Sequence, residues 1–140
     1  MRGRILVLAA LACTAAPVAV SAQDAFITNL LDKMTEVYGD KGYSPTGYQH
    51  QGAMNQGQEE VLKITLSGGS DFQIMGACNA DCGNMDIELR DASGTLVDKD
   101  ELEDDFPIVA ASAGGTYTAR VVMTKCSGNP CTYGVKAFRK

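Results

Sequence analysis

Four cysteines in two close pairs are the residues whose type and spacing point most directly to chemistry. In an exported chain, an even number of cysteines is typical of disulfides. A disulfide requires Cα atoms within about 7 Å, so the chain must reverse inside each pair. Turn-forming residues at 79–81 and 127–130 can provide the reversals. We therefore predict two local disulfides, while a crossed pairing stays open. The predicted pairs are Cys78 with Cys82 and Cys126 with Cys131.

A second group of side chains suggests a calcium site. Calcium prefers six or more oxygen ligands, and the candidates are Asp81, Asn84, Asp86, Asp104 and Asp105. The first three share one loop, and the last two come from a later connection that could meet it. The spacing matches no EF-hand, because Glu103 stands where the loop starting at Asp98 needs a glycine. The alternative is an acidic face that keeps the protein soluble. Calcium is the single cofactor that the residues suggest.

The sequence offers no recognisable catalytic machinery. Nucleophilic hydrolases need an imidazole base, and the chain has one histidine, His50, in a polar stretch. No nucleophile elbow or phosphate loop occurs, and nothing in the spacing of the acids predicts a converging glycosidase pair. We therefore expect no enzymatic activity. His50, Tyr43 and Tyr48 could instead belong to a binding loop, against the alternative of a solvated wrap around the domain edge.

The first 22 residues resemble a secretory signal. Arg2 and Arg4 precede a short apolar run, and small residues end at Ala22, where we expect cleavage. This predicts a secreted or periplasmic protein without a membrane span, because the run is shorter than the ~18 residues that a spanning helix needs. A lipoprotein site at Cys13 is the alternative. The segment holds two bases and no acid, so the net charge changes from −5 to −7 on its removal. Such a charge disfavours binding to nucleic acid or to anionic membrane surfaces.

Two hydrophobic periods predict the elements that must position these residues. Apolar residues at helical spacing predict one amphipathic helix over 24–38. Residues 40–60 are polar and predict an irregular connection, with one short strand at Ala53-Met54 at most. After Val61 the period becomes two, with turn signals about every ten residues. We predict an all-β, antiparallel, jelly-roll-like sandwich of about six to eight strands. The expected boundaries are 1–22 for the signal, 23–51 for the helix and polar connection, and 52–140 for the sandwich.

Three short motifs resemble a known family. Residues 52–57 precede the first long strand, residues 84–94 form a strand and turn, and residues 113–121 place glycines before an aromatic strand. From Gly52 to Phe138 the chain is similar to the bacterial pre-peptidase C-terminal domains, which are secreted β-sandwiches. The resemblance implies a non-catalytic module, and such domains usually accompany hydrolases. This chain departs from that arrangement because it has no catalytic domain and adds a leading helix and four cysteines.

Two functions follow as hypotheses. The first is a non-catalytic binding or accessory protein of the cell envelope, with a protein or an envelope glycan as its partner. The second is an inhibitor of a basic hydrolase such as a lysozyme, because an acidic surface speeds association with a cationic target. Binding of the second kind would weaken as salt increases.

Overall fold

One helix precedes eight strands in the part of the chain that the structure, a computed structural model, describes, which is residues 22–140. The predicted signal segment, including Cys13, lies outside these residues except for Ala22. The elements are α1 (Ala22–Asp40), β1 (Ser44–Met54), β2 (Glu59–Leu66), β3 (Phe72–Cys78), β4 (Cys82–Arg90), β5 (Leu96–Asp100), β6 (Ile108–Ala111), β7 (Gly115–Cys126) and β8 (Cys131–Arg139).

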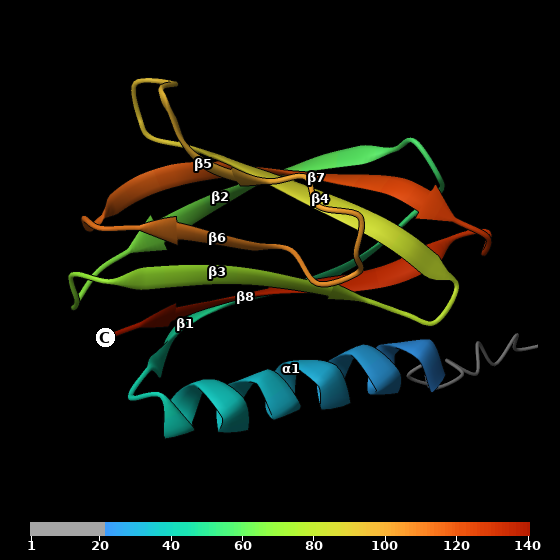
Figure 1. Cartoon of the computed structure of the whole chain (residues 1–140), viewed down its shortest axis with the longest axis horizontal. Coiled ribbons are helices and arrows are strands. Elements are labelled where there is room, and N and C mark those ends of the chain that lie inside the picture. The colour runs from blue at the N-terminus through green and yellow to red at the C-terminus, as the bar shows by residue number, and fades with distance from the viewer. Residues whose placement is uncertain (1–21) are drawn as a thin grey trace, which may run out of the picture.

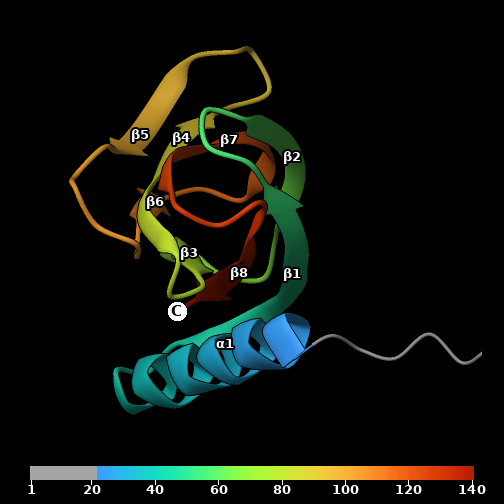
Figure 2. The same ribbon diagram turned by 90° about the vertical axis from the view of Figure 1, so that its right-hand side faces the viewer.

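The strands form two antiparallel sheets that pack face to face (Figures 1 and 2). One sheet has the order β1-β8-β3-β6 and the other has the order β2-β7-β4-β5. The first strand therefore pairs with the last, the second with the seventh, the third with the sixth and the fourth with the fifth. This nested pairing is that of a jelly roll. The predicted all-β sandwich is confirmed.

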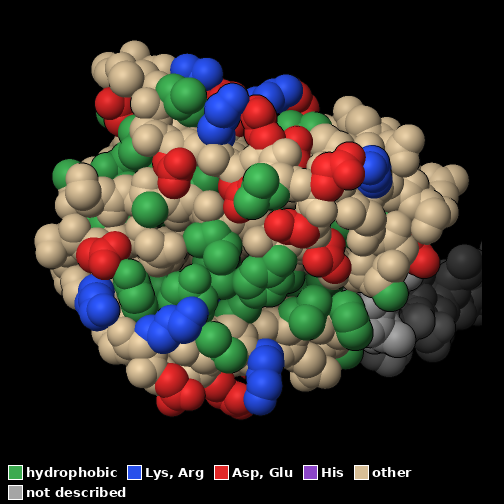
Figure 3. Space-filling model, in the orientation of Figure 1, with side chains coloured by type: hydrophobic (Ala, Val, Ile, Leu, Met, Phe, Trp, Pro, Cys, Tyr) green, Lys and Arg blue, Asp and Glu red, His purple; other side chains and the backbone are tan. Residues whose placement is uncertain are grey.

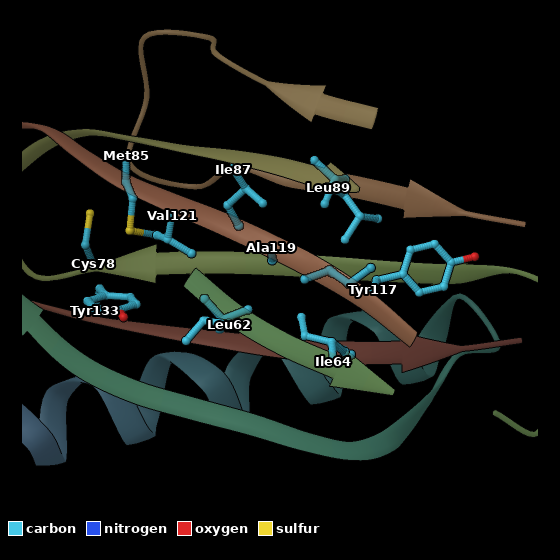
Figure 4. Close-up of a cluster of buried hydrophobic side chains, with 14 of the residues drawn as sticks. Leu62, Ile64, Cys78, Met85, Ile87, Leu89, Tyr117, Ala119, Val121 and Tyr133 are labelled. Atoms are coloured by element: carbon cyan, nitrogen blue, oxygen red, sulfur yellow. The ribbon is translucent and has the colours of Figure 1, made fainter. Parts of the chain in front are cut away.

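The main core lies between the two sheets. Alternate residues of each strand point inward, as the burial of every second residue in β2 shows. The same alternation in β4, β7 and β8 brings large apolar side chains together, and Figure 4 shows part of this layer. Its fully buried members include Ile64, Phe72, Ile74, Met85, Ile87, Leu89 and Tyr133.

A second, smaller core lies outside the sandwich, where α1 packs across the sheet that contains β1, β8 and β3 (Figure 2). The predicted helix is confirmed and extends two residues further at each end. Gly134 in β8 permits this contact, because a Cβ atom there would lie 2.8 Å from Cγ2 of Ile27 and 2.9 Å from Cδ1 of Leu31. The helix and sheet residues of this core are Ile27, Leu31, Met34, Tyr38, Met75, Ala77 and Phe138.

The polar segment before residue 60 is not the irregular connection that we predicted. Residues Ser44–Met54 form β1, an edge strand that pairs with β8 through a register shift between Pro45 and Gln49. An edge strand contacts the core with few side chains, and Met54 is the one fully buried residue of β1. The strand therefore lacks the apolar alternation on which the prediction depended.

The period of two could not identify the inward face of β6. Val109 and Ala111 enter the main core, at 0% and 4% exposure, and the alternating set Phe106, Ile108 and Ala110 does not. Phe106 remains 38% exposed before the strand begins. Both faces of β6 are apolar, so the period of two cannot show which face is inside.

Two carboxylates protect the free edge of β6. Asp98 Oδ2 accepts a hydrogen bond from the Ala110 N–H at 2.8 Å, and Asp100 Oδ2 accepts one from the Ile108 N–H at 2.9 Å. Both aspartates belong to β5, the edge strand of the opposite sheet. Unpaired N–H groups on an edge strand invite pairing with another chain, so this contact blocks such pairing while it joins the two sheets.

Replacing Asp98 and Asp100 together by alanine should destabilise the protein by about 1 kcal/mol for each hydrogen bond lost. It should also promote aggregation, because the edge of β6 becomes available. Urea unfolding and light scattering measure the two effects. Lys99→Ala is the matched control, because this exposed side chain forms a salt bridge with Glu101 and should change neither. Equal behaviour of the double variant and the control would contradict this role for the aspartates.

Candidate functional site

The four cysteines form the two predicted disulfides at one end of the sandwich. Cys78 bonds Cys82 with a Cα–Cα distance of 5.9 Å, and Cys126 bonds Cys131 with 6.1 Å. The crossed pairing is thus not present. Cys82 lies opposite Cys126 in the β4–β7 register, so the two bridged turns are neighbours. Backbone hydrogen bonds join them further, from the Asn79 N–H to Thr132 O and from the Ser127 N–H to Asp81 O.

Three of the five proposed calcium ligands are brought together. Asn84 is buried, and its Nδ2 donates to Asp86 Oδ1 at 3.2 Å and to Thr124 Oγ1 at 2.5 Å. Its Oδ1 accepts the N–H of Asp104 at 2.9 Å. Asp104 Oδ1 in turn accepts the N–H of Phe106. These groups therefore hold the β5–β6 connection against β4, which is a structural role.

The remaining two candidates lie in different surroundings. Asp81 packs beside the β7–β8 turn, where a Cβ on Gly128 would be 3.2 Å from its Oδ2. Asp105 is exposed, and its backbone oxygen lies 3.7 Å from the Cys78 sulfur. Within residues 22–140 no group of three or more histidine, cysteine, aspartate or glutamate side chains is arranged to hold a metal ion. The calcium site stays a prediction.

Asp86 occupies an unfavourable place for a carboxylate. Burial raises its pKa above the ordinary value, the hydrogen bond from Asn84 lowers it, and the nearby charges of Glu101, Asp100 and Asp104 raise it. A carboxyl whose pKa is higher in the folded state binds protons more readily there than in the unfolded chain. It therefore favours folding below its ordinary value of 3.8, and this contribution is lost as the pH rises through the folded-state pKa.

Asp86→Asn should therefore stabilise the protein near neutral pH by up to about 0.5 kcal/mol. The asparagine cannot ionise, and its Oδ1 can still accept the hydrogen bond from Asn84. The gain should disappear below pH 3.8, where aspartate is protonated in the unfolded chain. Urea unfolding at the two pH values measures it, and the exposed Asp105→Asn is the control. A loss of stability near neutral pH would show that the carboxylate has a stabilising partner, and a calcium-dependent melting temperature in the wild type alone would identify it.

His50 lies on β1 and not in a binding loop. Its Nε2 is 3.1 Å from Glu60 Oε1 and 3.2 Å from the Tyr133 hydroxyl, and that hydroxyl donates to Glu60 Oε2. Burial raises the pKa of Tyr133, and the hydrogen bond to Glu60 raises it further, so the phenol stays protonated. Because Glu60 belongs to β2 and the other two to β1 and β8, this cluster joins the two sheets at their open edge.

The two tyrosines predicted as binding groups are also engaged within the fold. Tyr43 donates to Asp71 Oδ2 at 2.8 Å, and its ring lies 5.4 Å from that of Tyr38. Tyr48 packs against the main core, and burial raises its pKa, with Glu60 adding to the effect. These two tyrosines therefore have structural contacts. An exposed apolar surface lies elsewhere on the molecule.

The sequence reasoning missed an apolar groove between α1 and the β6 side of the sheet. Its cavity volume is about 240 Å³. One wall is a stripe of α1 together with the first residue past its end: Leu30, Lys33, Met34, Val37, Tyr38 and Lys41. The other wall consists of Phe106 and Ile108, and Met75 of β3 also lines it. Figure 3 shows this apolar patch near the centre of the molecule, with basic side chains along its lower and left margins.

Two signals in the sequence could have indicated this groove. The apolar stripe of the predicted helix is wider than the part of the helix that the sheet covers, since Val37 remains 44% exposed. The segment 106–111 is apolar on both faces, so one face must lie outside the main core. Neither signal alone says that the two surfaces meet, because that depends on where α1 crosses the sheet.

Together, these features define a disulfide-bonded jelly-roll β-sandwich with a helix packed on one outer face. Disulfides of this kind are typical of proteins outside the cytoplasm. No helix among residues 22–140 is long and apolar enough to cross a membrane. No family model matches the chain, and a search of curated proteins finds no significant match. The resemblance to pre-peptidase C-terminal domains thus stays a prediction.

Proposed function

We propose that this protein is a non-catalytic, extracytoplasmic binding or accessory module of the cell envelope, similar in role to the pre-peptidase C-terminal domains. The observation that carries the proposal is the apolar groove along α1. Contiguous apolar surface on a charged protein commonly marks an interaction site. The groove is hollowed, and its two walls come from separate elements of a rigid fold.

The proposed non-catalytic character is supported by the engagement of the reactive side chains. All four cysteines between residues 22 and 140 are oxidised. His50 contacts Glu60 and Tyr133, and neither partner is a serine or cysteine nucleophile. The phenol of Tyr133, with its raised pKa, is a donor to Glu60 and not an activated oxyanion.

The acidic side chains give less support to an inhibitor of basic hydrolases. Several glutamates pair with bases of this same chain, including Glu59 with Arg120 and Glu103 with Lys125. Asp98 and Asp100 are occupied by backbone N–H groups. A cationic partner would have to compete with these internal contacts. Inhibition of a lysozyme therefore stays a prediction from the charge alone.

Binding to separated envelope fractions tests the proposal. Purified protein is incubated with peptidoglycan, with membrane vesicles and with a basic lysozyme, at low and high salt. We expect retention on an envelope fraction that persists at high salt, because apolar contacts are not screened as charges are. Val37→Glu should abolish it. Val61→Glu is the matched control, because Val61 is 60% exposed on β2 and lies outside the groove.

Salt-sensitive inhibition of lysozyme without envelope retention would overturn the proposal in favour of the inhibitor. Turnover of an envelope substrate would overturn the non-catalytic part. If Val37→Glu and the wild type are retained equally, the binding surface lies outside the groove.

A further inference from the structure

We propose that the groove binds a single-chain anionic amphiphile, of the medium-chain fatty acid type, with its acyl chain along α1 and its carboxylate at Lys41. This inference rests on the proposed binding function and names its ligand class. It depends on the shape of the groove, its volume and the placement of one unpaired amine.

The groove has the form of a channel. Leu30, Met34 and Val37 recur every three or four residues, so they follow one line along α1, and Lys41 lies in the turn just past the end of the helix. From Leu30 to Val37 the helix rises about 10 Å. Phe106 faces this line from the connection that precedes β6. An extended apolar chain fits such a channel better than a compact ring system does.

The volume of the groove limits the length of the chain. An engineered apolar cavity of about 150 Å³ binds benzene, so a groove of about 240 Å³ has room for about ten carbon atoms. Val37 and Phe106 are 44% and 38% exposed in the structure, and a bound acyl chain would cover both. Each buried methylene would tighten binding about fourfold.

The charges at the groove select an anion at one end. Lys33 pairs with Glu36 at 2.6 Å, so its charge is already compensated. Lys41 has no carboxylate within salt-bridge distance among residues 22–140, and its Nζ lies 4.8 Å from the centre of the Tyr38 ring. Lys140 lies over the adjacent ring of Tyr43 at 5.0 Å, which brings a second amine to this end.

The partial charge at the end of α1 makes a cation such as Lys41 necessary for binding an anion there. The C-terminal end of a helix carries partial negative charge, and α1 ends at Asp40. An anion is repelled there unless a cation compensates. The carboxylate should therefore depend on Lys41, while the acyl chain should not. A partner helix or a second copy of the chain would cover the apolar line without needing this amine.

Isothermal titration with decanoate below its micelle concentration tests the inference. We expect saturable binding of one decanoate per chain. Hexanoate should bind on the order of 100-fold more weakly, because four methylenes are missing. Neutral decan-1-ol should bind several-fold more weakly than decanoate, because it gains nothing from Lys41.

Two variants with matched controls locate the site. Val37→Glu places a carboxylate in the channel and should weaken decanoate binding at least tenfold, while Val61→Glu should leave it unchanged. Lys41→Gln should weaken decanoate about fivefold and leave decan-1-ol unchanged, while the exposed Lys63→Gln should alter neither. Thermal unfolding of each variant checks that the fold is intact.

The inference is overturned if decanoate shows no saturable binding, or if Val37→Glu binds it as the wild type does. It is also overturned if the wild type sediments as a dimer that Val37→Glu converts to a monomer, because a second copy then covers the groove. Envelope retention without decanoate binding would remove this ligand and leave the proposed function. Decanoate binding without envelope retention would keep this ligand and remove the proposed envelope function.

Discussion

Replacing Leu31 by alanine should lower the free energy of unfolding by about 2 to 5 kcal/mol. Leu31 is fully buried between α1 and β8, where its Cδ atoms lie over the Cα of Gly134. The truncation removes apolar contacts and leaves a cavity that a helix held along its whole length cannot easily close. Urea unfolding followed by circular dichroism measures the loss. The exposed Asn29→Ala on the same helix is the control and should change stability little.

The opposite change at the same contact should also destabilise. Gly134→Ala adds a Cβ atom 2.8 Å from Ile27 Cγ2, so the helix must shift, at a cost of about 1 to 3 kcal/mol. Gly39→Ala is the matched control, because a Cβ there meets nothing within 4 Å. It should be neutral or stabilising by about 0.5 kcal/mol, since alanine favours the helix. Neutral behaviour of both Leu31→Ala and Gly134→Ala would mean that α1 is not held on the sheet in this way.

Removing either disulfide should cost about 2 kcal/mol, because each bridge closes a short loop. Paired replacements by alanine, Cys78→Ala with Cys82→Ala and Cys126→Ala with Cys131→Ala, test this by urea unfolding. Alanine is preferred to serine because Cys131 is fully buried. The fourfold variant should lose less than the sum of the two losses. Cys82 and Cys126 are opposite one another, so both bridges restrain the same end.

Mass measurement before unfolding checks whether Cys78, Cys82, Cys126 and Cys131 of the wild type are all oxidised, as the two bridges require. A fourfold variant as stable as the wild type would contradict a stabilising role for the bridges. A loss equal to the sum would show that the two bridges act independently, on separate parts of the fold.

Local patterns predicted the parts of this fold that have one polar and one apolar face. Strands such as β2 and β4 alternate clearly, and the stripe of α1 is long enough to be distinctive. The disulfide pairing followed from turn residues and chain geometry. The prediction failed for β1, which is nearly all polar, and the period of two could not identify the inward face of β6, which is apolar on both sides. In these strands the pairing partner, and not the strand's own sequence, decides which side faces inward.

The candidate site shows a different limit. The acids between residues 81 and 105 suggested ligands for a cation, but several of them accept hydrogen bonds from backbone N–H groups. Asp98, Asp100 and Asp104 have such partners between 2.8 and 3.1 Å away. A carboxylate can bind a cation or accept hydrogen bonds from the backbone. Which of the two it does depends on which N–H groups the fold leaves unpaired. The groove depends on the crossing of α1 over the sheet, which no local pattern contains.

The position of β8 has a consequence for how the chain reaches its native state during synthesis. This last strand lies between β1 and β3, and it supplies Gly134 and Phe138 to the seat of α1. Until residues 131–139 have emerged, β1 lacks its pairing partner and the surface on which α1 docks lacks Gly134 and Phe138. A growing polypeptide can therefore pair β2, β7, β4 and β5 early, but it completes the β1-β8-β3-β6 sheet and the seat of α1 only when residues 131–139 are free. These long-range pairings form slowly. The layer that carries α1 is therefore the last part of the sandwich to be completed.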